Sequence, residues 1–258
     1  MQKVQEIKIL KGFSIAALHT HTKHSDGMVS PAELVRQAGE AQIKVLAITD
    51  HDTMTGIAEA EKTARKFDIE IVAGEEIQTS LPRGLHVLGL FLKHPIPHGH
   101  SVLWTIKEIR KQKGLAIIPH PFVSFFRTIP APTAAFQKKD LISLVKQTKI
   151  DGIEIGHRFL SKTTKEKLES FYKNNQKLLG AQIGASDSHF GKDDLLSYFT
   201  IFPGKTAQDL YKAIKKRQTK EVAGEMGHLK PVHIAIQISK SLTILAFRRY
   251  IFRSLGKI

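Results

Sequence analysis

Short apolar, β-branched runs alternate along the chain with longer segments of helical periodicity. This alternation is typical of parallel strands whose connections are helices. Seven strand-like runs separated by helix-like segments favour a (β/α) barrel over an open sheet, so the expected fold class is α/β. The expected strands are residues 15–18, 45–49, 69–73, 86–91, 115–118, 152–155 and 182–185.

Two of the expected helix starts carry the spacing of a capping box. Ser30 precedes Pro31 and stands three residues before Glu33, and Thr163 stands three residues before Glu166. A Ser or Thr side chain at this position accepts a hydrogen bond from the first turn, and Pro fits there because its missing N–H is not needed. We therefore expect helices to begin just after Ser30 and Thr163.

The chain changes character after Glu225. Residues 226–258 contain no acidic residue, although the segment carries six Lys and Arg residues and is otherwise largely apolar. We therefore predict a barrel domain over residues 1–225 and a basic C-terminal tail or helix over residues 226–258. Three roles fit this tail: it lies on an anionic membrane surface, it holds a nucleic-acid substrate, or it docks on the barrel with its cations outward.

The composition is that of a folded protein with a full-sized core. The 258 residues are 41% hydrophobic and 24% charged, which argues against intrinsic disorder. No apolar run reaches the roughly 18 residues of a membrane-spanning helix. The opening MQKVQEIKILKG also lacks the apolar stretch of a signal peptide. We expect a cytoplasmic protein, and the basic tail is compatible with a peripheral position on a membrane.

Charge and cysteine content narrow the chemistry. Lys and Arg number 39 against 24 Asp and Glu, a formal net charge of +15, which favours phosphorylated small molecules, nucleic acid or an anionic membrane as partners. The absence of cysteine excludes disulfides, thiolate zinc sites and cysteine nucleophiles. Thirteen histidines therefore make imidazole and carboxylate ligands the first candidates for a metal site.

Histidine and acidic residues gather next to the expected strands. A barrel places its catalytic groups at the carboxyl ends of its strands, and a His-x-His pair in extended backbone can turn both imidazoles to one side. A single such pair is as well explained by a polar loop, but six ordered motifs point to a metal centre. In chain order they are His19-Thr20-His21 with Ser25-Asp26-Gly27, Thr49-Asp50-His51-Asp52, Gly74-Glu75-Glu76, His86-Val87-Leu88-Gly89, His120-Pro121 and Ser186-Asp187-Ser188-His189.

Taken in order, these motifs resemble those of the PHP family, named for polymerase and histidinol phosphatase. The resemblance covers about residues 15–200. It is closest to the stand-alone phosphoesterases, which include nucleotide bisphosphate phosphatases and short-RNA exonucleases. It is weaker for histidinol phosphatases, where His usually replaces the Asp of the first motif. The resemblance implies a distorted (β/α)7 barrel of the PHP type that holds two or three divalent ions of Mn, Fe or Zn.

The resemblance also implies the ligands of each ion, with Glu76 bridging the first two and with Asp26, His51, Glu76 and His189 taking part in catalysis. Glu75 is an alternative to Glu76, because a slip of one residue in a strand exchanges the side chain that faces the barrel; the family pattern favours Glu76. The implied ligands are His19, His21, Glu76 and Asp187 for the first ion, Glu76, His86 and His120 for the second, and Asp26, His51 and His189 for the third.

Several further side chains are candidates for supporting roles. Arg127 and Arg158 follow the fifth and sixth strands, so both are expected at the same rim, where they would bind substrate phosphate. His24 and His157 are weaker candidates there. Asp50 beside His51 either orients that imidazole or caps the following turn.

The chemistry expected of such a site is phosphoester hydrolysis. Divalent ions roughly 3.5–4 Å apart lower the pKa of a shared water and neutralise phosphate oxygens. The preferred prediction is a hydrolase that acts on a phosphate monoester of a nucleotide or similar small metabolite through a metal-bridging hydroxide. The alternatives are a nuclease acting on the ends of short RNA or DNA, and a non-catalytic PHP-like binding scaffold.

Overall fold

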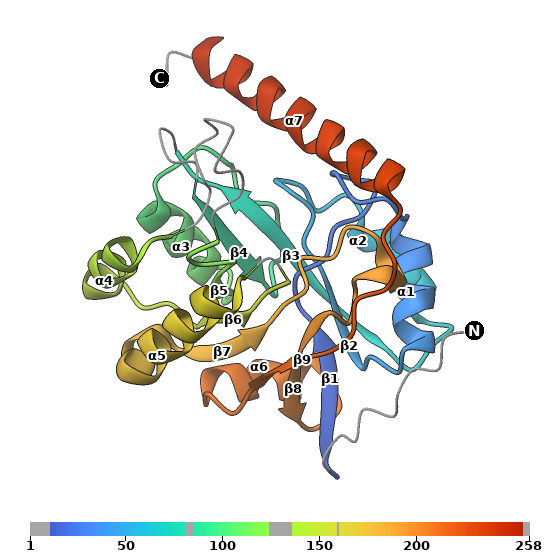
Figure 1. Ribbon diagram of the computed structural model, residues 1–258, viewed down its shortest axis with the longest axis horizontal. Coiled ribbons are helices and arrows are strands. Elements are labelled where there is room, and N and C mark those ends of the chain that lie inside the picture. The colour runs from blue at the N-terminus through green and yellow to red at the C-terminus, as the bar shows by residue number, and fades with distance from the viewer. Residues whose placement is uncertain (1–10, 81–84, 124–135, 159, 255–258) are drawn as a thin grey trace.

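The computed structural model describes residues 11–80, 85–123, 136–158 and 160–254, which form one nearly closed, barrel-shaped sheet with helices around it (Figure 1). Nine strands are hydrogen-bonded in the order β7-β6-β5-β4-β3-β2-β1-β8-β9. The strands are β1 (Phe13–Ala17), β2 (Val45–Ile48), β3 (Glu70–Gln78), β4 (His86–Leu90), β5 (Leu115–Ile118), β6 (Gly152–Gly156), β7 (Ala181–Gly184), β8 (Tyr198–Pro203) and β9 (Lys220–Ala223).

The helices lie mainly on the outer side of this sheet (Figure 1). One apolar cluster joins α1 and α2 to the strands at one side, and another joins α3, α4 and α5 to the strands at the other. The helices are α1 (Pro31–Glu40), α2 (Ile57–Ala64), α3 (Val102–Lys111), α4 (Lys138–Gln147), α5 (Lys162–Leu179), α6 (Ala207–Lys215) and α7 (Pro231–Ser254), with a short 3₁₀ helix η1 (Gly191–Asp193).

All seven predicted strands are present, and the α/β barrel class is confirmed. Two further strands, β8 and β9, were not predicted. The β9 segment is the four-residue Lys-Glu-Val-Ala, whose residues are half-buried or exposed, so it offers no apolar run from which a strand is recognised. Both strands extend the sheet beyond β1, and β9 forms its edge.

The prediction of a wholly parallel sheet is wrong at β4 and at β8. Strand β4 runs antiparallel to both β3 and β5, and β8 runs antiparallel to β1. The connection from Gln78 to His86 explains the first reversal, because a crossover between parallel strands needs a dozen or more residues. One consequence matters for the site: the first residue of β4, His86, pairs with Gln78 near the end of β3. The start of β4 therefore meets the same rim as the ends of its neighbours.

The barrel closes between β7 and the β8–β9 hairpin through side chains. The Thr200 hydroxyl accepts from Gly184 N at 3.0 Å and is 2.9 Å from Gly184 O, to which it donates. Thr219 Oγ1 donates to Gln182 O at 2.7 Å. A Cβ at position 184 would lie 2.1 Å from Phe199 O, so only glycine permits this approach. Side-chain hydroxyls thus join β7 to the β8–β9 hairpin, between which no ladder of backbone hydrogen bonds is present in the described residues.

The two predicted helix starts had different outcomes. The Ser30 hydroxyl accepts from Glu33 N at 3.2 Å, and α1 begins at Pro31 as expected. The prediction for Thr163 is wrong, because α5 begins at Lys162 with Ser161 as its cap, whose hydroxyl accepts from Thr164 N. Ser161 has the extended backbone that a cap requires, and the matching spacing of Thr163 and Glu166 lies inside the first turn.

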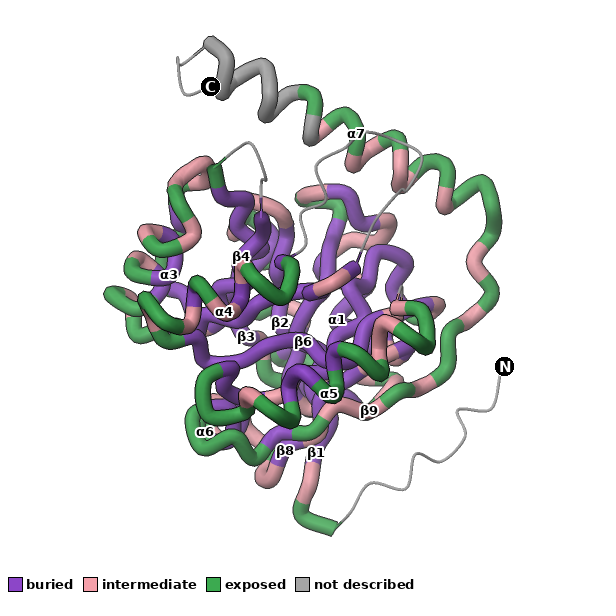
Figure 2. The backbone as a smooth tube through the Cα atoms, turned by 60° about the vertical axis from the view of Figure 1, so that its left-hand side comes forward, coloured by how far each residue is buried: buried purple, intermediate pink, exposed green. Residues whose placement is uncertain are grey.

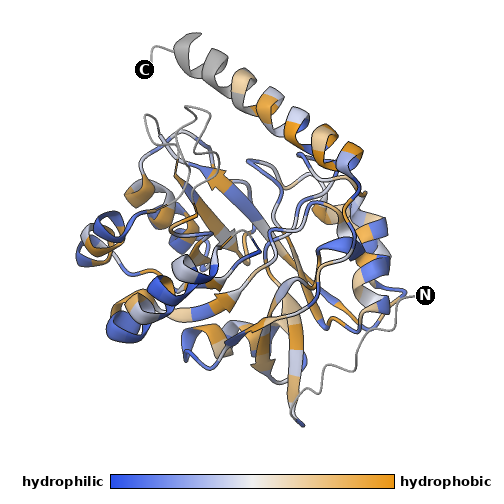
Figure 3. Cartoon of the chain, viewed as in Figure 1, coloured by the Kyte–Doolittle hydropathy of each residue, from blue (hydrophilic) through white to orange (hydrophobic). Residues whose placement is uncertain are grey.

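The last helix, α7, is the element least covered by the rest of the protein. Most of its described residues are exposed or half-buried (Figure 2), although hydrophobic residues recur along it (Figure 3). Val232, Ile236 and Leu242 are 58%, 43% and 47% exposed. None of the described helices is both long and apolar enough to cross a membrane. The division of the chain at residue 225 stays a prediction, although its C-terminal part is largely helical as expected.

Replacing Thr200 by Val should lower the free energy of unfolding by about 1–3 kcal/mol, because the isosteric side chain leaves the buried N–H and C=O of Gly184 without their partner. Urea denaturation followed by circular dichroism measures the change. Thr63→Val is the matched control, because the Thr63 hydroxyl bonds to an exposed carbonyl of α2. Equal stability of the two variants would contradict the closure role of Thr200.

Candidate metal centre

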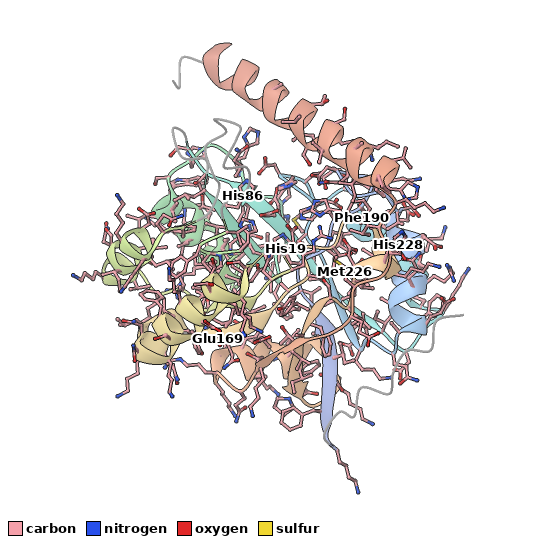
Figure 4. All side chains as sticks on the ribbon, viewed as in Figure 1. His19, His86, Glu169, Phe190, Met226 and His228 are labelled. Atoms are coloured by element: carbon pink, nitrogen blue, oxygen red, sulfur yellow. The ribbon has the colours of Figure 1, made fainter. Side chains whose placement is uncertain are left out.

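Six segments bring histidine and carboxylate side chains to one end of the barrel. The first and last are joined directly, because His21 N donates to Ser188 O at 2.8 Å and Ser188 N donates to His19 O at 3.1 Å. These bonds form an isolated parallel bridge between Thr20 and Ser188, just beyond the ends of β1 and β7, which are not neighbours in the sheet. Figure 4 places His19 and His86 close to the middle of the barrel. The pairing fixes the first and last motifs side by side although about 170 residues separate them.

Four buried side chains aim one donor atom each at a common point. His19 Nε2 and His21 Nε2 are 3.1 Å apart. Glu76 Oε2 lies 3.2 Å and 3.3 Å from these two nitrogens, and Asp187 Oδ1 lies 3.3 Å and 3.1 Å from them. The four residues are those expected to hold the first ion.

This arrangement fits a metal ion by its own geometry. Donor atoms about 2.0–2.2 Å from one ion stand about 3.0–3.5 Å apart at neighbouring positions of its coordination shell. The five distances above, 3.1–3.3 Å, fall in that range. Two carboxylates and two imidazoles are also a donor set suited to divalent Mn, Fe and Zn. The cluster can therefore bind metal.

Glu76 stands at the centre of the whole set. Its Oε1 lies 2.7 Å from His86 Nδ1 and 2.9 Å from His120 Nε2, while its Oε2 lies 3.2 Å from His51 Nδ1. Glu75 points elsewhere, and its Oε2 accepts from Ile96 N at 2.8 Å. The strand alternation of β3 thus turns Glu76, and not its neighbour, into the barrel. This is the orientation that the family resemblance favoured.

A third group surrounds Asp26 at the end of the first loop. Asp26 Oδ1 lies 3.2 Å from His189 Nε2, 3.7 Å from His21 Nδ1 and 3.9 Å from His51 Nε2. Its three expected members are therefore together, and His21 joins them through its second ring nitrogen. The structure brings all nine expected ligands into one connected cluster. Which of them bind ions stays a prediction.

The groupings differ from expectation in one respect. His51 was expected only beside Asp26, yet donor atoms of His51, Glu76 and His86 lie within 4.8 Å of one another. The side chain of His51 stands between the two groups, with Nδ1 toward Glu76 and Nε2 toward Asp26. His51 and His21 each face two groups, one through each ring nitrogen, but a neutral imidazole has a lone pair for only one ion.

Three imidazoles of the cluster, those of His19, His21 and His120, have a raised pKa. Burial lowers the pKa of His21, but hydrogen bonds to Asp187 and Glu76 outweigh it and raise the pKa to about 10. For His19, burial likewise lowers the pKa, and the charges of Glu76, Glu154 and Asp187 raise it well above its ordinary value. The pKa of His120 is also raised, chiefly by its bond to Glu76, against burial.

The carboxylates shift in the opposite direction. Burial raises the pKa of Asp26, Glu76 and Asp187, but the facing imidazoles lower each pKa well below its ordinary value. The three acids therefore stay ionised over the physiological range. A divalent ion that binds to His19, His21 and His120 would therefore displace protons from these rings.

Glu154 supports the cluster and was missed by the sequence analysis. Its side chain is fully buried; Oε1 lies 2.8 Å from His19 Nδ1, and Oε2 accepts from His120 N at 2.7 Å. A carboxylate behind a ligating imidazole fixes the orientation of its ring. The signal was present in the sequence, because Glu154 stands between Ile153 and Ile155 inside an apolar strand.

Asp50 shapes the loop after β1. Its Oδ1 accepts from Thr22 N at 2.7 Å and from Ser25 Oγ at 2.5 Å, and its Oδ2 accepts from Thr22 Oγ1 at 2.7 Å. Neither role considered for Asp50 from sequence describes these contacts. Gly27 completes the loop, because a Cβ there would lie 2.4 Å from His21 O. Together they turn the chain so that Asp26 faces the histidines.

Two of the expected ligands sit in unusual backbone. His120 has φ 31° and Asp187 has φ 50°, in the left-handed region that favours glycine. Such conformations cost about 1–3 kcal/mol each and persist where the surroundings determine them. Here the His120 N–H is held by Glu154 and the Asp187 carboxylate is drawn to His19 and His21. These polar contacts hold both residues in place.

Of the two arginines expected to bind phosphate, the structure describes only Arg158. Arg127 lies outside the described residues. The side chain of Arg158 is only 4% exposed and forms an ion pair with Asp194, and its Nη2 is 3.4 Å from His189 Nδ1. Asp194, also missed from sequence, accepts from His189 N at 2.8 Å. Arg158 is thus a buried neighbour of His189, and its contact with substrate stays a prediction.

The two weaker histidine candidates lie in different surroundings. His157 is buried, with Nε2 3.4 Å from Asp187 Oδ2, and burial lowers its pKa. His24 is half-exposed, with Nδ1 2.8 Å from Thr55 Oγ1. His157 therefore joins the cluster, whereas His24 stands at its margin.

Comparison with known proteins identifies the domain that carries this cluster. The model of the PHP domain matches residues 17–228. In sequence, the chain is 41% identical over 101 residues to a 5'-3' exoribonuclease of Haemophilus influenzae. This alignment covers 39% of this chain and 37% of that protein. The chain is 34% identical over 98 residues to a 3',5'-nucleoside bisphosphate phosphatase of Chromobacterium violaceum, which covers 38% of this chain and 34% of that protein. The alignments thus span about a third of these two relatives.

A solved structure shares the fold. It is a two-domain protein of Bacteroides vulgatus that contains a predicted PHP-like metal-dependent phosphoesterase. The superposition has a TM-score of 0.69, covers 93% of this chain and 74% of that chain, and has 20% sequence identity. At that identity the likeness bears on the fold, and it confirms the barrel.

Glu154→Gln should weaken Mn²⁺ binding about 10- to 100-fold, because the amide keeps the size of the side chain but loses the charge that orients His19. Equilibrium dialysis with Mn²⁺ measures the affinity. Glu169→Gln, on the exposed side of α5, is the matched control and should bind as the wild type does. Unchanged affinity in Glu154→Gln would show that His19 needs no such support.

Binding of Mn²⁺ should release protons and strengthen with rising pH from about pH 6 to about pH 9. The sign follows from the raised pKa of His21, about 10, and of His19 and His120: these rings carry protons that metal must displace. Calorimetry at pH 7 in two buffers of different ionisation enthalpy counts the protons. An enthalpy independent of the buffer would contradict the protonated state of the free site.

Proposed function

The chain belongs to the PHP domain family, and on this premise we propose that it is a metal-dependent phosphoesterase, a hydrolase of phosphoric ester bonds. Its proposed substrate is a phosphate monoester of a nucleotide or a similar small metabolite. The proposal rests on one observation, a set of four donor atoms from His19, His21, Glu76 and Asp187. Five of the six distances between these atoms are 3.1–3.3 Å. Such a set suits a divalent cation.

Two or three divalent ions of Mn, Fe or Zn are the proposed cofactors. Three groups of donor atoms support this number, and imidazole with carboxylate suits all three elements. The first group is His19, His21, Glu76 and Asp187; the second centres on Glu76 with His86, His120 and His51; and the third is Asp26, His51 and His189 with His21.

The residues of the chain have separate tasks in this proposal. When bound, the ions supply an activated water and neutralise the phosphate oxygens. Glu76 holds two groups at a fixed separation, because each of its oxygens faces different histidines. Glu154 keeps the His19 ring in position. Asp26, His51, Glu76 and His189 are the proposed catalytic residues, as the family resemblance implies, and all four lie in the cluster.

A nuclease acting on the ends of short RNA or DNA is the second candidate. One relative is named as a 5'-3' exoribonuclease and another as a nucleoside bisphosphate phosphatase, so the family match supports both reactions equally. The net charge of +15 favours a polyanionic substrate. A non-catalytic scaffold is disfavoured, because every expected ligand position carries a competent side chain and all of them converge.

The surroundings of the site suggest its partners. A phosphorylated small molecule is the proposed partner, and nucleic acid fits the same charge. The exposed apolar side chains of α7, with no acidic residue after Glu225, also suit an anionic membrane surface. We propose a cytoplasmic enzyme in which residues 1–225 form the catalytic barrel and residues 226–258 an added segment.

Asp187→Asn should lower phosphate release by about 100-fold or more, because the loss of one anionic ligand weakens the metal site that does the chemistry. The assay measures phosphate released from nucleoside monophosphates, bisphosphates and sugar phosphates with added Mn²⁺, after metal content has been determined. Asp68→Asn is the control, because the Asp68 side chain is 91% exposed. Full activity of Asp187→Asn would overturn the assignment.

The same preparations separate the two candidate reactions. The phosphatase proposal predicts phosphate release from one class of small molecule and no shortening of end-labelled oligoribonucleotides. Progressive shortening without such release would establish the nuclease. Absence of bound metal in the wild type, together with absence of both activities, would leave only the scaffold.

A further inference from the structure

The C-terminal helix α7 contacts the candidate metal centre through hydrogen bonds to the first loop. Ser241 Oγ donates to Asp26 Oδ2, and Gln237 Nε2 lies 3.3 Å from the same oxygen. Lys240 Nζ donates to the adjacent carbonyl, Gly27 O, at 2.9 Å. The three side chains stand at positions i, i+3 and i+4, so they share one face of the helix.

The two oxygens of Asp26 have different surroundings. Oδ1 faces the histidines of the third group, at 3.2 Å from His189 Nε2, whereas Oδ2 faces α7. The donors are ordered, because Gln237 Nε2 donates to Ser241 Oγ at 2.9 Å while that hydroxyl donates to Asp26. The carboxylate is 2% exposed, so these protein groups replace water as its partners. They fix its rotation and leave Oδ1 directed at the histidines.

The way α7 docks also argues for a role at the site. A helix on a globular protein usually buries an apolar stripe and exposes its polar face. In α7 the polar residues Gln237, Lys240 and Ser241 face the barrel, while Val232 and Leu242 are 58% and 47% exposed. Ile234 and Ile238 of α7 are only half-buried, so apolar burial accounts for this orientation only in part. The contacts with Asp26 and Gly27 add polar partners on the same side of the helix.

We propose that Ser241 and Gln237 are positioning residues that hold Asp26 as a ligand of the metal group formed with His21, His51 and His189. The inference rests on the proposed metal-dependent function and deepens it. The family model ends at residue 228, so α7 lies beyond the matched domain and adds a contact of its own. Occupancy of this one group by metal is thereby coupled to the docking of the C-terminal helix.

The test measures Mn²⁺ binding to the full chain by equilibrium dialysis and elemental analysis. In the double variant Ser241→Ala/Gln237→Ala we expect one class of Mn²⁺ site to weaken about 10- to 100-fold. The remaining classes should be unchanged, because the described contacts of α7 with the cluster reach only the loop at Asp26 and Gly27. Loss from one class alone is a result that general destabilisation would not produce.

Two further variants sharpen the test. Ser239→Ala removes the same hydroxyl from an exposed position of α7, so it should bind Mn²⁺ as the wild type does. Ser241→Thr, with Gln237 unchanged, keeps a hydroxyl donor. This variant should bind Mn²⁺ in every class as the wild type does. Circular dichroism should show the same helix content in all four proteins.

The outcomes separate this inference from the function on which it rests. If the wild type binds Mn²⁺ and the double variant binds it as Ser239→Ala does, the positioning role is overturned and the phosphoesterase proposal stands. Equal weakening of every class would also overturn it, since that result indicates a structural role for α7. A wild-type chain that binds no Mn²⁺ would overturn the proposed function and this inference together.

Discussion

The buried carboxylate of Glu76 is the interaction on which the rest of the site depends. Imidazole nitrogens of five histidines lie within 3.3 Å of its two oxygens, and the residue is 1% exposed. A buried charge without partners costs several kcal/mol, so the segments that supply these partners must converge on β3. They come from or follow β1, β2, β4 and β5, which an open sheet would spread apart. Curvature of the sheet into a barrel satisfies this one carboxylate from both sides.

Around this carboxylate the structure places a second layer of acids that contact the ligand residues and their loops. Glu154 holds His19 and the backbone of His120, Asp50 holds the loop that carries Asp26, and Asp194 holds the backbone of His189. Each acid comes from a strand or loop next to the ligand that it supports. The strained backbone of His120 is held in this way. These contacts fix the orientation of the donor groups, which reduces the cost of ordering the site.

The C-terminal helix α7 also holds one of the expected ligands in position, although it lies outside the barrel. Ser241 of α7 meets one oxygen of Asp26 while the histidines meet the other, so one carboxylate links an added segment to the centre. The apolar outward residues of the same helix stay exposed. The helix therefore links the surface of the protein to the carboxylate of Asp26.

The sequence by itself determined the seven strands of the barrel core and predicted which side chains gather at its rim, because each motif lies beside an apolar run and a cysteine-free chain leaves only imidazole and carboxylate. It favoured Glu76 over Glu75 through the family spacing, but only the tertiary structure turns Glu76 to the histidines and Glu75 to Ile96. It did not reveal that β4 reverses, which explains why His86 begins its strand while the other expected ligands lie near the end of theirs or after it. Nor did it reveal Glu154 or Ser241, whose partners are 135 and 215 residues away along the chain. Local patterns record which face of a strand a side chain takes, whereas contacts over such separations exist only once the barrel has closed and α7 has docked.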